Sequence, residues 1–396
     1  MLRRAIPGLG RAVRTAHPRS LSKLSVDPRE NPGDRMQAWQ IHSYKGLDDL
    51  RLSSVRMPVI TSPTDVLVKI EAASVNPIDV AMTDGYGNTL LNVIRKAKGL
   101  AIGTWSQLEE LDLPLTLGRD FAGVVVSKGH DVGSRLGLGE EVWGVIPIEQ
   151  QGCHANYVVV DGSLVNPRPR KLSHIEAASI PYAGLTAWSA LWITGGLCYK
   201  TAIVTRLNRR VLVMGGSGGV GTLAVQMLKA WNMHVISTCS SDAVEMLQNL
   251  GADTVIDYKR DGADAEIISE GPYDMILDCA NQGPEHVRTR GYPHDTYIAL
   301  NSPLLKNFDN HGLIMGMAQN LGDLLKFNIP KVENRSCVKW GFFIPSQTGI
   351  SVLQKFVEDE KIVPVVQQVY PFQDLPLAYE RLRQGHLRGK VVIDMR

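Results

Sequence analysis

A glycine-rich run at residues 215–221 has the residue types and the spacing that binding a pyrophosphate requires. Gly216, Gly218 and Gly221 satisfy the pattern G-x-G-x-x-G, directly after the apolar run 211–214 and directly before a helical pattern. The first glycine of such a loop permits a tight turn, the second lets the backbone approach the phosphates, and the third lets helix and strand pack closely. The helix N-terminus then faces the anion. We therefore predict a dinucleotide site here, in preference to a flexible turn.

The residues at the end of the next apolar strand help to decide whether the site binds NAD or NADP. A site for NAD usually has a carboxylate there, about 20 residues after the glycines, that binds the ribose 2′-hydroxyl. This chain has Thr238-Cys239-Ser240-Ser241 instead, so a 2′-phosphate meets no repulsion and Ser240 can donate to it. Tyr258 and Lys259, after the following strand, can add a hydroxyl and a positive charge. We predict NADPH; the alternative is that Ser240 only caps a helix and Tyr258 only packs.

Residues 73–79 and 117–123 are the two stretches in which ligands for a catalytic zinc, which would activate a substrate oxygen, are expected. In zinc-dependent relatives of this architecture, a Cys follows the second strand and a His-Glu pair follows a later glycine, whereas Asn76 and Arg119 stand at those places here. An amide and a guanidinium do not replace a thiolate and an imidazole as zinc ligands. The five cysteines form no C-x-x-C pair and the ten histidines no H-x-x-x-H pair. The sequence therefore predicts no metal site.

The elements that must position these residues change in character near residue 182. Residues 36–181 hold short β-rich runs bounded by turn residues, which predicts an antiparallel, barrel-like domain. Residues 182–335 alternate strands with helices, which predicts an α/β domain with a doubly wound parallel sheet. Residues 336–396 return to short strands, so this tail is expected to rejoin the first domain. The other expected elements are a helix over 90–96 within the long segment 84–117, helices over 219–231, 242–250 and 374–384, and strands that include 362–366 and 390–393.

Composition and charge narrow the class of protein. The 396 residues are 44% apolar, with a formal net charge of +2, so the chain has no broad basic surface for nucleic acid and no apolar run of about 20 residues for crossing a bilayer. Before Asp27 the chain carries only basic charges, together with several serines. This pattern predicts a mitochondrial transit peptide and linker over residues 1–35, the alternative being an untargeted disordered tail. Scattered cysteines suit a reducing compartment such as the matrix.

Seven stretches carry motifs that occur together in one family. They are residues 74–79, 115–120, 182–190, 216–221, 255–259, 340–343 and 384–390. With these motifs the chain resembles the quinone oxidoreductase branch of the medium-chain dehydrogenase/reductase family, and within it a mitochondrial, reticulon-interacting subgroup. The resemblance runs from about residue 36 to the end. It implies a GroES-like β-barrel catalytic domain into which a Rossmann domain is inserted.

The same resemblance implies a function and a set of contacts. It implies a zinc-independent NADPH oxidoreductase of the matrix that transfers hydride to a quinone or to an activated alkene or carbonyl. It also implies support of coenzyme Q biosynthesis and respiratory function, with a reticulon-type membrane protein as a partner. The implied cofactor contacts are Ser217, Gly218, Gly219, Val220, Gly221, Ser240, Tyr258, Leu300, Phe343, His386, Leu387 and Arg388. The chain departs from the family's Asn-Val-Gly-Gly-like turn at residues 278–283, so the resemblance implies no nicotinamide-side contacts there.

Three polar side chains are candidates for direct roles in the chemistry. Asn76 can orient a substrate or the nicotinamide through its amide, and Tyr86 can polarise an oxygen or relay a proton. Thr186 is expected near the nicotinamide. The structural alternatives are that Asn76 and Pro77 form a turn and that Tyr86 lies on a mobile loop.

Asp79 is the fourth catalytic candidate, and its alternative is a structural ion pair with a nearby basic residue such as Arg119. Arg119 with Asp120 is likewise expected to be a structural ion pair and not a catalytic one. A second hypothesis for the whole chain is a scaffold that binds NADPH and a partner but has little catalytic activity.

Overall fold

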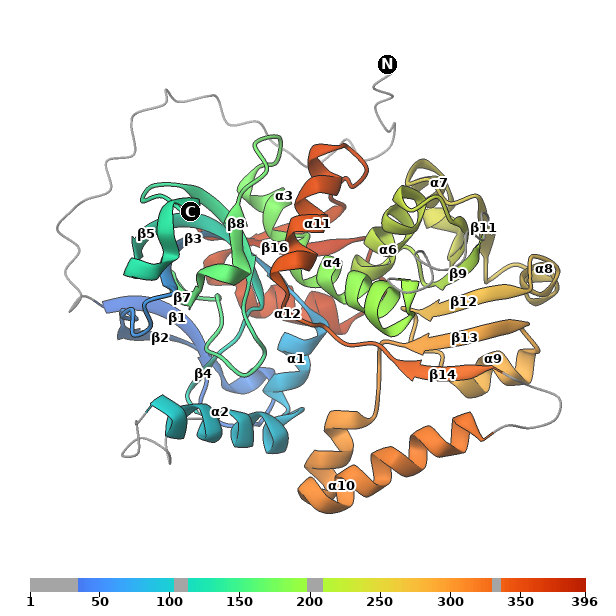
Figure 1. Ribbon diagram of the computed structural model, residues 1–396, viewed down its shortest axis with the longest axis horizontal. Helices are drawn as coiled ribbons and strands as arrows, with labels where there is room; N and C mark the ends of the chain where they lie inside the picture. Colours follow the sequence, from blue (N-terminus) through green and yellow to red (C-terminus); the bar gives the residue numbers. More distant parts are fainter. Residues whose placement is uncertain (1–34, 103–112, 198–208, 330–335) are drawn as a thin grey trace.

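The computed structural model describes residues 35–102, 113–197, 209–329 and 336–396, which fold into two domains that lie side by side (Figure 1). The predicted transit peptide falls almost wholly outside the described residues, as does Cys198. Within these four ranges no helix has both the length and the apolar composition needed to span a membrane.

One domain contains a six-stranded parallel sheet in the order β11-β10-β9-β12-β13-β14. The central strand β9 buries Val211, Leu212 and Val213 completely, because helices cover both faces of such a sheet. The strands are β9 (Arg210–Met214), β10 (His234–Cys239), β11 (Thr254–Asp257), β12 (Tyr273–Asp278), β13 (His294–Ala299) and β14 (Cys337–Trp340). The helices are α6 (Gly219–Ala230), α7 (Val244–Asn249), α8 (Ala263–Ser269), α9 (Pro284–Arg290) and α10 (Leu304–Asn328). The predicted doubly wound sheet is confirmed.

The other domain contains a seven-stranded sheet and a small three-stranded sheet. The larger has the order β15-β16-β3-β5-β6-β8, with β7 paired to β3, and the smaller has the order β2-β1-β4. The strands are β1 (Arg35–Ile41), β2 (Leu50–Arg56), β3 (Asp65–Val75), β4 (Leu115–Thr116), β5 (Asp120–Lys128), β6 (Glu141–Val145), β7 (Tyr157–Asp161), β8 (Val165–Pro167), β15 (Val366–Pro371) and β16 (Lys390–Asp394). The helices are α1 (Pro77–Thr83), α2 (Asn88–Ile102), α3 (His174–Ala178), α4 (Pro181–Trp188), α11 (Gln347–Glu358) and α12 (Leu375–Arg383).

The C-terminal tail returns to the first domain, as the sequence predicts, because β16 pairs antiparallel with β3. Three details differ from expectation. The strand expected over 362–366 lies later, since β15 begins at Val366. The parallel sheet also includes β14, which follows the boundary expected at residue 335. The long helix α10 and the helix α11 are not among the predicted elements, although Ser346 caps the start of α11 by accepting from Gly349 N.

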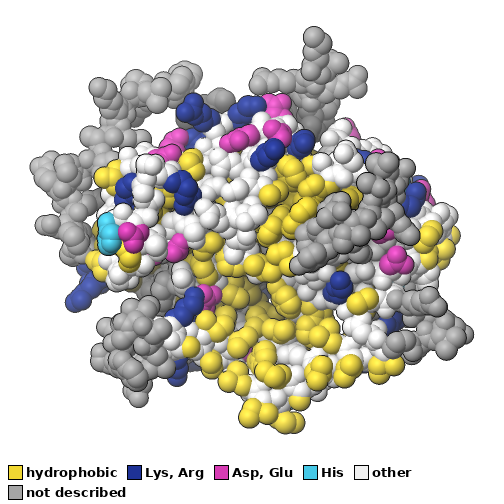
Figure 2. All heavy atoms as spheres, in the orientation of Figure 1, with side chains coloured by type: hydrophobic (Ala, Val, Ile, Leu, Met, Phe, Trp, Pro, Cys, Tyr) yellow, Lys and Arg dark blue, Asp and Glu magenta, His cyan; other side chains and the backbone are white. Residues whose placement is uncertain are grey.

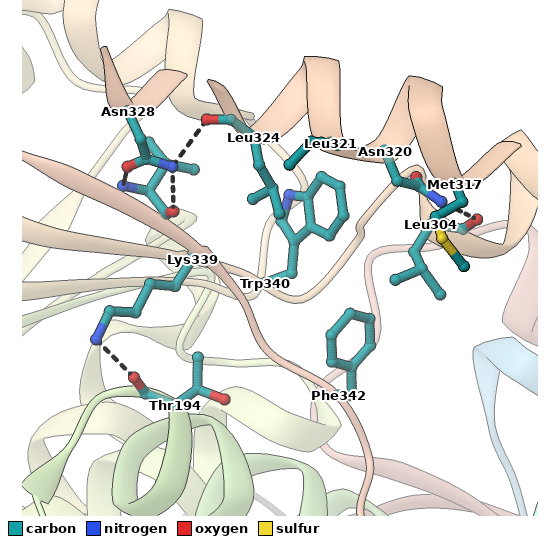
Figure 3. A pocket seen from close by; sticks show the side chains of 11 residues that line it. Thr194, Leu304, Met317, Asn320, Leu321, Leu324, Asn328, Lys339, Trp340 and Phe342 are labelled. Carbon is teal, nitrogen blue, oxygen red and sulfur yellow. Dashed lines mark hydrogen bonds between the residues drawn. The ribbon is translucent and has the colours of Figure 1, made fainter. Parts of the chain in front are cut away.

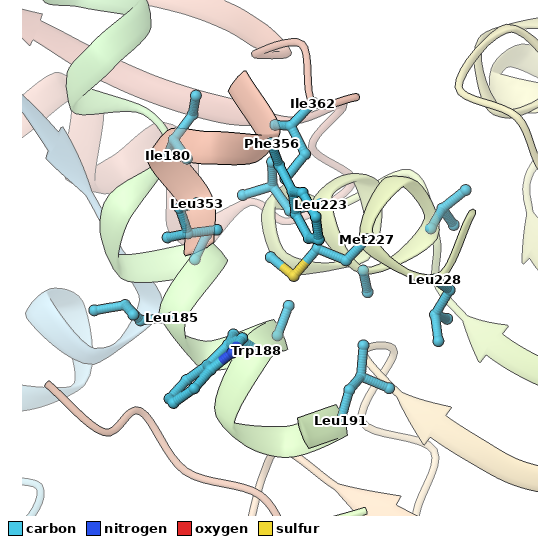
Figure 4. Close-up of a cluster of buried hydrophobic side chains, with 14 of the residues drawn as sticks. Ile180, Leu185, Trp188, Leu191, Leu223, Met227, Leu228, Leu353, Phe356 and Ile362 are labelled. Atoms are coloured by element: carbon cyan, nitrogen blue, oxygen red, sulfur yellow. The ribbon is translucent and has the colours of Figure 1, made fainter. Parts of the chain in front are cut away.

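A cluster of buried hydrophobic side chains fixes the two domains to one another (Figure 4). Trp188 on α4, Leu223 on α6 and Phe356 on α11 all belong to it. Gly184 on α4 lies so close to α11 that an added Cβ would stand 2.9 Å from the methyl groups of Leu353. The cluster therefore sets the position of α4, which carries Thr186, relative to the helix that follows the glycine loop.

Candidate active site

The glycine loop has the close contacts that its motif predicts, with the roles shared among four glycines. Gly215 has a φ of +74°, so it makes the tight turn. A Cβ on Gly216 would stand 1.9 Å from Ser237 Oγ, and one on Gly221 would stand 2.4 Å from the carbonyl oxygen of Gly215. By contrast, the nearest atom to a Cβ on Gly218 is 3.7 Å away. The loop is therefore packed on its inner side and open at Gly218, where α6 begins and its backbone N–H groups can meet an anion.

The C-terminal segment closes over this loop from the other domain. Gly389 N–H donates to the carbonyl oxygen of Ser217 at 2.9 Å, and Gly218 forms a parallel bridge with Gly389. Gly389 has a φ of +84°, and a Cβ there would stand 2.1 Å from Val365 O. The close approach of the two backbones requires a glycine at residue 389, and it brings Arg388 across the cleft.

Arg388 reaches the end of β10, where the sequence predicts a 2′-phosphate contact. Its Nη2 donates to Ser240 Oγ at 2.6 Å and lies 2.8 Å from Asp242 Oδ1, while its Nε donates to Asp242 Oδ2 at 3.0 Å. Ser240 is almost fully buried and donates in turn to Asp242 Oδ1 at 2.7 Å. The hydrogen bond from Arg388, and then that from Ser240, hold the pKa of Asp242 well below its usual range. Tyr258, half exposed, lines the same cavity. One serine, one tyrosine and one arginine thus gather at this corner.

A cavity of about 1520 Å³ runs along the interface of the two domains and collects nearly all the predicted site residues. The predicted residues that line it are Asn76, Tyr86, Thr186, Ser217, Gly218, Gly219, Val220, Gly221, Ser240, Tyr258, Leu300, His386, Leu387 and Arg388. The turn at residues 278–283 contributes as well, through Cys279, Ala280 and Asn281. Asp278 holds that turn by accepting from Ala280 N and Gly283 N, each at 2.9 Å. The cavity therefore joins the glycine loop and the Ser240 corner to Asn76 and Thr186, as an extended dinucleotide requires.

Two predicted residues do not line the cavity. Asp79 is fully buried behind it, where its carboxylate accepts from Asn76 N and Gly118 N, both at 2.9 Å. Arg119 Nε lies 3.6 Å from the same carboxylate. Phe343 contributes indirectly, because its ring stacks on Tyr182, which does line the cavity, with 4.2 Å between the ring centroids.

The prediction that Arg119 forms an ion pair with Asp120 was wrong. Arg119 pairs with Asp79, the alternative that the sequence also offered, and Asp120 bonds elsewhere. Asp120 Oδ1 accepts from Ser74 Oγ at 2.5 Å and from Asn76 Nδ2 at 2.9 Å, and its Oδ2 accepts from Tyr182 N at 3.0 Å. The side chains of residues 119 and 120 point in different directions because they are adjacent at the start of a strand. Asp120 therefore orients the amide of Asn76.

Lys390 is a site residue that the sequence reasoning missed. Its side chain is 6% exposed, lines the cavity, and donates from Nζ to Asn76 Oδ1 at 2.5 Å. Burial lowers the pKa of Lys390, whereas the charges of Asp120 and Asp79 oppose that shift. A lysine directly after the Arg-Gly pair was visible in the sequence, but only the fold shows that β16 passes beside Asn76.

Tyr86 and Thr186 both line the cavity. Burial, and to a lesser extent the charge of Asp309, raises the pKa of Tyr86, so the phenol keeps its proton at neutral pH. Thr186 Oγ1 donates to the carbonyl oxygen of Tyr182 at 2.8 Å within its own helix. Because its hydroxyl proton is used in that bond, Thr186 can only accept a hydrogen bond from a ligand.

Comparisons with known proteins agree with this geometry. Residues 62–170 match the alcohol dehydrogenase GroES-like domain, and residues 250–393 match the family described as zinc-binding dehydrogenase. The chain is 45% identical to the mitochondrial NAD(P)H oxidoreductase RTN4IP1 of Drosophila melanogaster, over 93% of this chain and 88% of the relative. Identity to the human protein of the same name is 40%, over 91% and 89% of the two chains. The chain belongs to the RTN4IP1 family of mitochondrial NAD(P)H oxidoreductases.

A solved structure supports the wider assignment of this RTN4IP1-family chain to the quinone oxidoreductase branch of the medium-chain dehydrogenases. The quinone oxidoreductase of Coxiella burnetii has 26% sequence identity and a TM-score of 0.70, with 92% of this chain and 100% of that chain covered. The predicted fold and enzyme class are thereby confirmed, and the mitochondrial location accords with the relatives' names.

The zinc that one matching family model implies does not fit the residues present in this RTN4IP1-family member. At the expected place, Asn76 offers an amide that is bonded to Lys390 and Asp120, and Arg119 offers a buried cation. In the part of the chain that the structure describes, no three His, Cys, Asp or Glu side chains are grouped as metal ligands would be. A divalent cation beside two buried basic side chains would meet repulsion.

Proposed function

We propose that this enzyme transfers hydride from NADPH, without zinc, to a quinone or to an activated alkene or carbonyl. The observation that carries the cofactor preference is the corner at the end of β10. There Arg388 Nη2 and Ser240 Oγ are 2.6 Å apart, just after β10 ends at Cys239, and the carboxylate of Asp242 bonds to both side chains. A guanidinium and two hydroxyls suit a phosphate dianion, which would exchange places with Asp242 as the partner of Arg388.

The glycine loop and α6 supply the rest of the dinucleotide site. The pyrophosphate is expected against Gly218 and Gly219, where the loop is open and the helix dipole is favourable. The reduced nicotinamide, when bound, supplies the hydride. The proposal assigns the orientation of the nicotinamide to Thr186 and Asn76, because both side chains line the cavity.

Asn76 and Lys390 give the far end of the cavity its chemistry. Reduction of a carbonyl or quinone places negative charge on an oxygen, and an enzyme gains rate by holding donors ready for that charge. Lys390 provides a buried positive charge, and its hydrogen bond to Asn76 Oδ1 keeps the amide of Asn76 fixed. Tyr86 holds its proton on the phenol oxygen and is proposed as the donor to the reduced product.

The proposal is tested by comparing NADPH with NADH on the purified protein. NADPH is expected to raise the melting temperature and quench tryptophan fluorescence at concentrations where NADH does neither, because only the ligand that binds the native state stabilises it. Steady-state rates with a panel of benzoquinones and enones then measure the reaction. Tight NADPH binding without turnover would instead favour the scaffold hypothesis.

Tyr258→Phe tests the 2′-phosphate contact within this proposal. Removal of one hydroxyl that bonds to a charged group is expected to weaken NADPH about 10-fold and to leave NADH unchanged. Tyr370→Phe removes a tyrosine hydroxyl outside the cavity and serves as the matched control. An unchanged preference for NADPH over NADH would mean that Tyr258 does not bind the 2′-phosphate.

The place of the reaction in the cell is also a proposal. Because the relatives are named mitochondrial, and one from Caenorhabditis elegans is named a reticulon-4-interacting protein, we propose a matrix enzyme that supports coenzyme Q biosynthesis and contacts a reticulon-type membrane protein. Fractionation of mitochondria with protease protection, and quinone levels in cells lacking the protein, test location and role. Normal quinone levels in those cells would contradict the role.

A further inference from the structure

An apolar groove outside the cofactor cavity lies between α10 and the edge of the parallel sheet. Its volume is about 630 Å³. Figure 3 shows Leu321, Leu324 and Met317 on α10 facing Trp340 and Phe342, which belong to β14 and the residues just after it. Leu304, at the start of α10, closes one end.

Three polar side chains in the groove, those of Asn320, Asn328 and Lys339, are already bonded within the protein. Asn320 Nδ2 donates to Leu304 O at 3.1 Å, and Asn328 Nδ2 donates to Val338 O at 3.0 Å. Lys339 Nζ donates to Thr194 O at 3.0 Å, away from the apolar wall. What the groove offers a ligand is therefore hydrocarbon surface, which suits a hydrocarbon chain better than a peptide with its own polar groups.

The helix beside the groove exposes large apolar side chains that the described fold does not cover. Ile314, Met317 and Leu321 are 85%, 66% and 59% exposed, and Figure 2 shows hydrophobic side chains gathered along α10 and above it. Contiguous apolar patches on a protein surface commonly mark a site of interaction. Gly312 interrupts α10 with a φ of +71°. The part of α10 after Gly312 is therefore a separate helical segment, and it carries this apolar face.

Both walls of the groove continue into the walls of the cofactor cavity. Leu300 and Asn301 line the cavity, and Leu304 lines the groove a few residues later. Phe342 lines the groove, while the next residue, Phe343, stacks on Tyr182 in the cavity wall.

The start of α10 is also fixed to the loop that carries Tyr86. Asp309 Oδ2 accepts from Gly87 N at 2.6 Å, and Asp309 Oδ1 accepts from Thr89 N at 3.1 Å. The helix that forms one wall of the groove is therefore bonded to the loop of Tyr86, and Tyr86 lines the cavity.

We propose that this groove binds the hydrocarbon tail of a quinone whose head group occupies the Asn76 end of the cavity. The substrate class is then a quinone with an isoprenoid or alkyl tail, and a tail-less quinone lacks the contacts with the groove. This inference rests on the proposed quinone reductase function, and it adds that α10 selects substrates by their tails. The tail gains affinity because its burial removes apolar surface from water.

Ubiquinones with zero, one and two isoprene units share one head group and test the tail directly. With NADPH saturating, kcat/KM is expected to rise about 10-fold for the first added unit, which corresponds to burying about two methylene groups. Leu321→Gln and Met317→Gln place a polar group in the groove at exposed positions, where folding tolerates it. Each is expected to remove most of that gain and to leave the rate with the tail-less quinone unchanged. Leu325→Gln, on the same helix but outside the groove, is the matched control and should keep the gain.

A binding measurement separates failure of this inference from failure of the proposed function. A brominated alkyl chain should quench the fluorescence of Trp340, a signal that Trp340→Phe removes. Quenching without reduction of any quinone would keep the groove as a tail site and overturn the reductase function. Reduction that ignores tail length, with no quenching, would keep the function and overturn the tail site. Sedimentation gives a third outcome. If the protein is a dimer that Leu321→Gln converts to a monomer, and the rates do not depend on the tail, the groove is an interface between two copies of the chain. That result would also overturn the tail site.

Discussion

Two corners of the cleft each hold a basic side chain beside a carboxylate, yet solvent reaches them very differently. At the Ser240 corner, Asp242 is 65% exposed and pairs directly with Arg388. At the Asn76 corner, Lys390 is 6% exposed and meets Asp120 only through the amide of Asn76. Water and salt screen the first pair, whereas the second acts in a medium of lower polarity. The first arrangement suits selection of a charged ligand, and the second suits stabilisation of charge that appears during a reaction.

This difference predicts that the largest loss of activity comes from the buried corner. Lys390→Met keeps the length of the side chain and removes its charge, so kcat is expected to fall about 100-fold, as for loss of a preorganised donor. Affinity for NADPH should change little. Steady-state kinetics with fluorescence titration separate the two effects, and Lys171→Met, on the surface, is the control for loss of a lysine charge.

A pH profile distinguishes a catalytic charge at residue 390 from a structural one. Because burial lowers the pKa of Lys390, the charged form is lost at a lower pH than for an ordinary lysine, whose pKa is about 10.4. The wild-type kcat should decline in that alkaline range, and the decline should be absent from Lys390→Met. A parallel decline in both proteins would mean that Lys390 only supports Asn76.

The exposed corner should respond in binding and not in turnover. Arg388→Gln removes the charge that faces Ser240, and NADPH affinity is expected to fall about 20-fold because hydrogen bonds to charged groups contribute about 1.5–3 kcal/mol. NADH affinity and kcat at saturation should stay the same. Isothermal titration at two salt concentrations checks this, with Arg396→Gln as the control outside the cavity. An equal loss of affinity for NADPH and NADH would mean that Arg388 does not bind the 2′-phosphate.

The two corners also differ in how far the sequence predicted them. The glycine loop and Ser240 are local: a strand, a turn and a helix follow one another, so spacing alone located them. Lys390 and Asn76 meet because β16 pairs with β3, and pairing across some 300 residues leaves no mark in local spacing. Asp120 was assigned to the wrong partner for the same reason, since its bonds to Asn76 and Tyr182 depend on tertiary placement.

The long helix α10 shows another limit of prediction from the sequence. Its residues include several glycines and asparagines and its apolar side chains lie on more than one face, so it carries no clean amphipathic pattern. A helix of that kind becomes evident only when its contacts with α2 and β14 are seen. By contrast, the alternation of strands and helices from residue 210 to 300 predicted the sheet, because the apolar strands inside it, such as β9 and β12, are buried on both faces.

Asp242→Asn is expected to have the smallest effects, in opposite directions for binding and stability. In the free protein Asp242 competes with a phosphate for Arg388, so its neutral replacement should tighten NADPH about 3-fold, a change typical of a screened surface charge. Stability should fall slightly, by at most about 1 kcal/mol, because the exposed pair is lost. The folded-state pKa of Asp242 lies below its unfolded value, so its contribution is complete above about pH 4 and is lost as pH falls through the folded pKa. Urea unfolding at neutral and acid pH should therefore show the difference between wild type and variant shrinking in acid. Weaker NADPH binding in Asp242→Asn would mean that this carboxylate positions Arg388 for the cofactor instead of competing with it, and the exposed corner would then be as preorganised as the buried one.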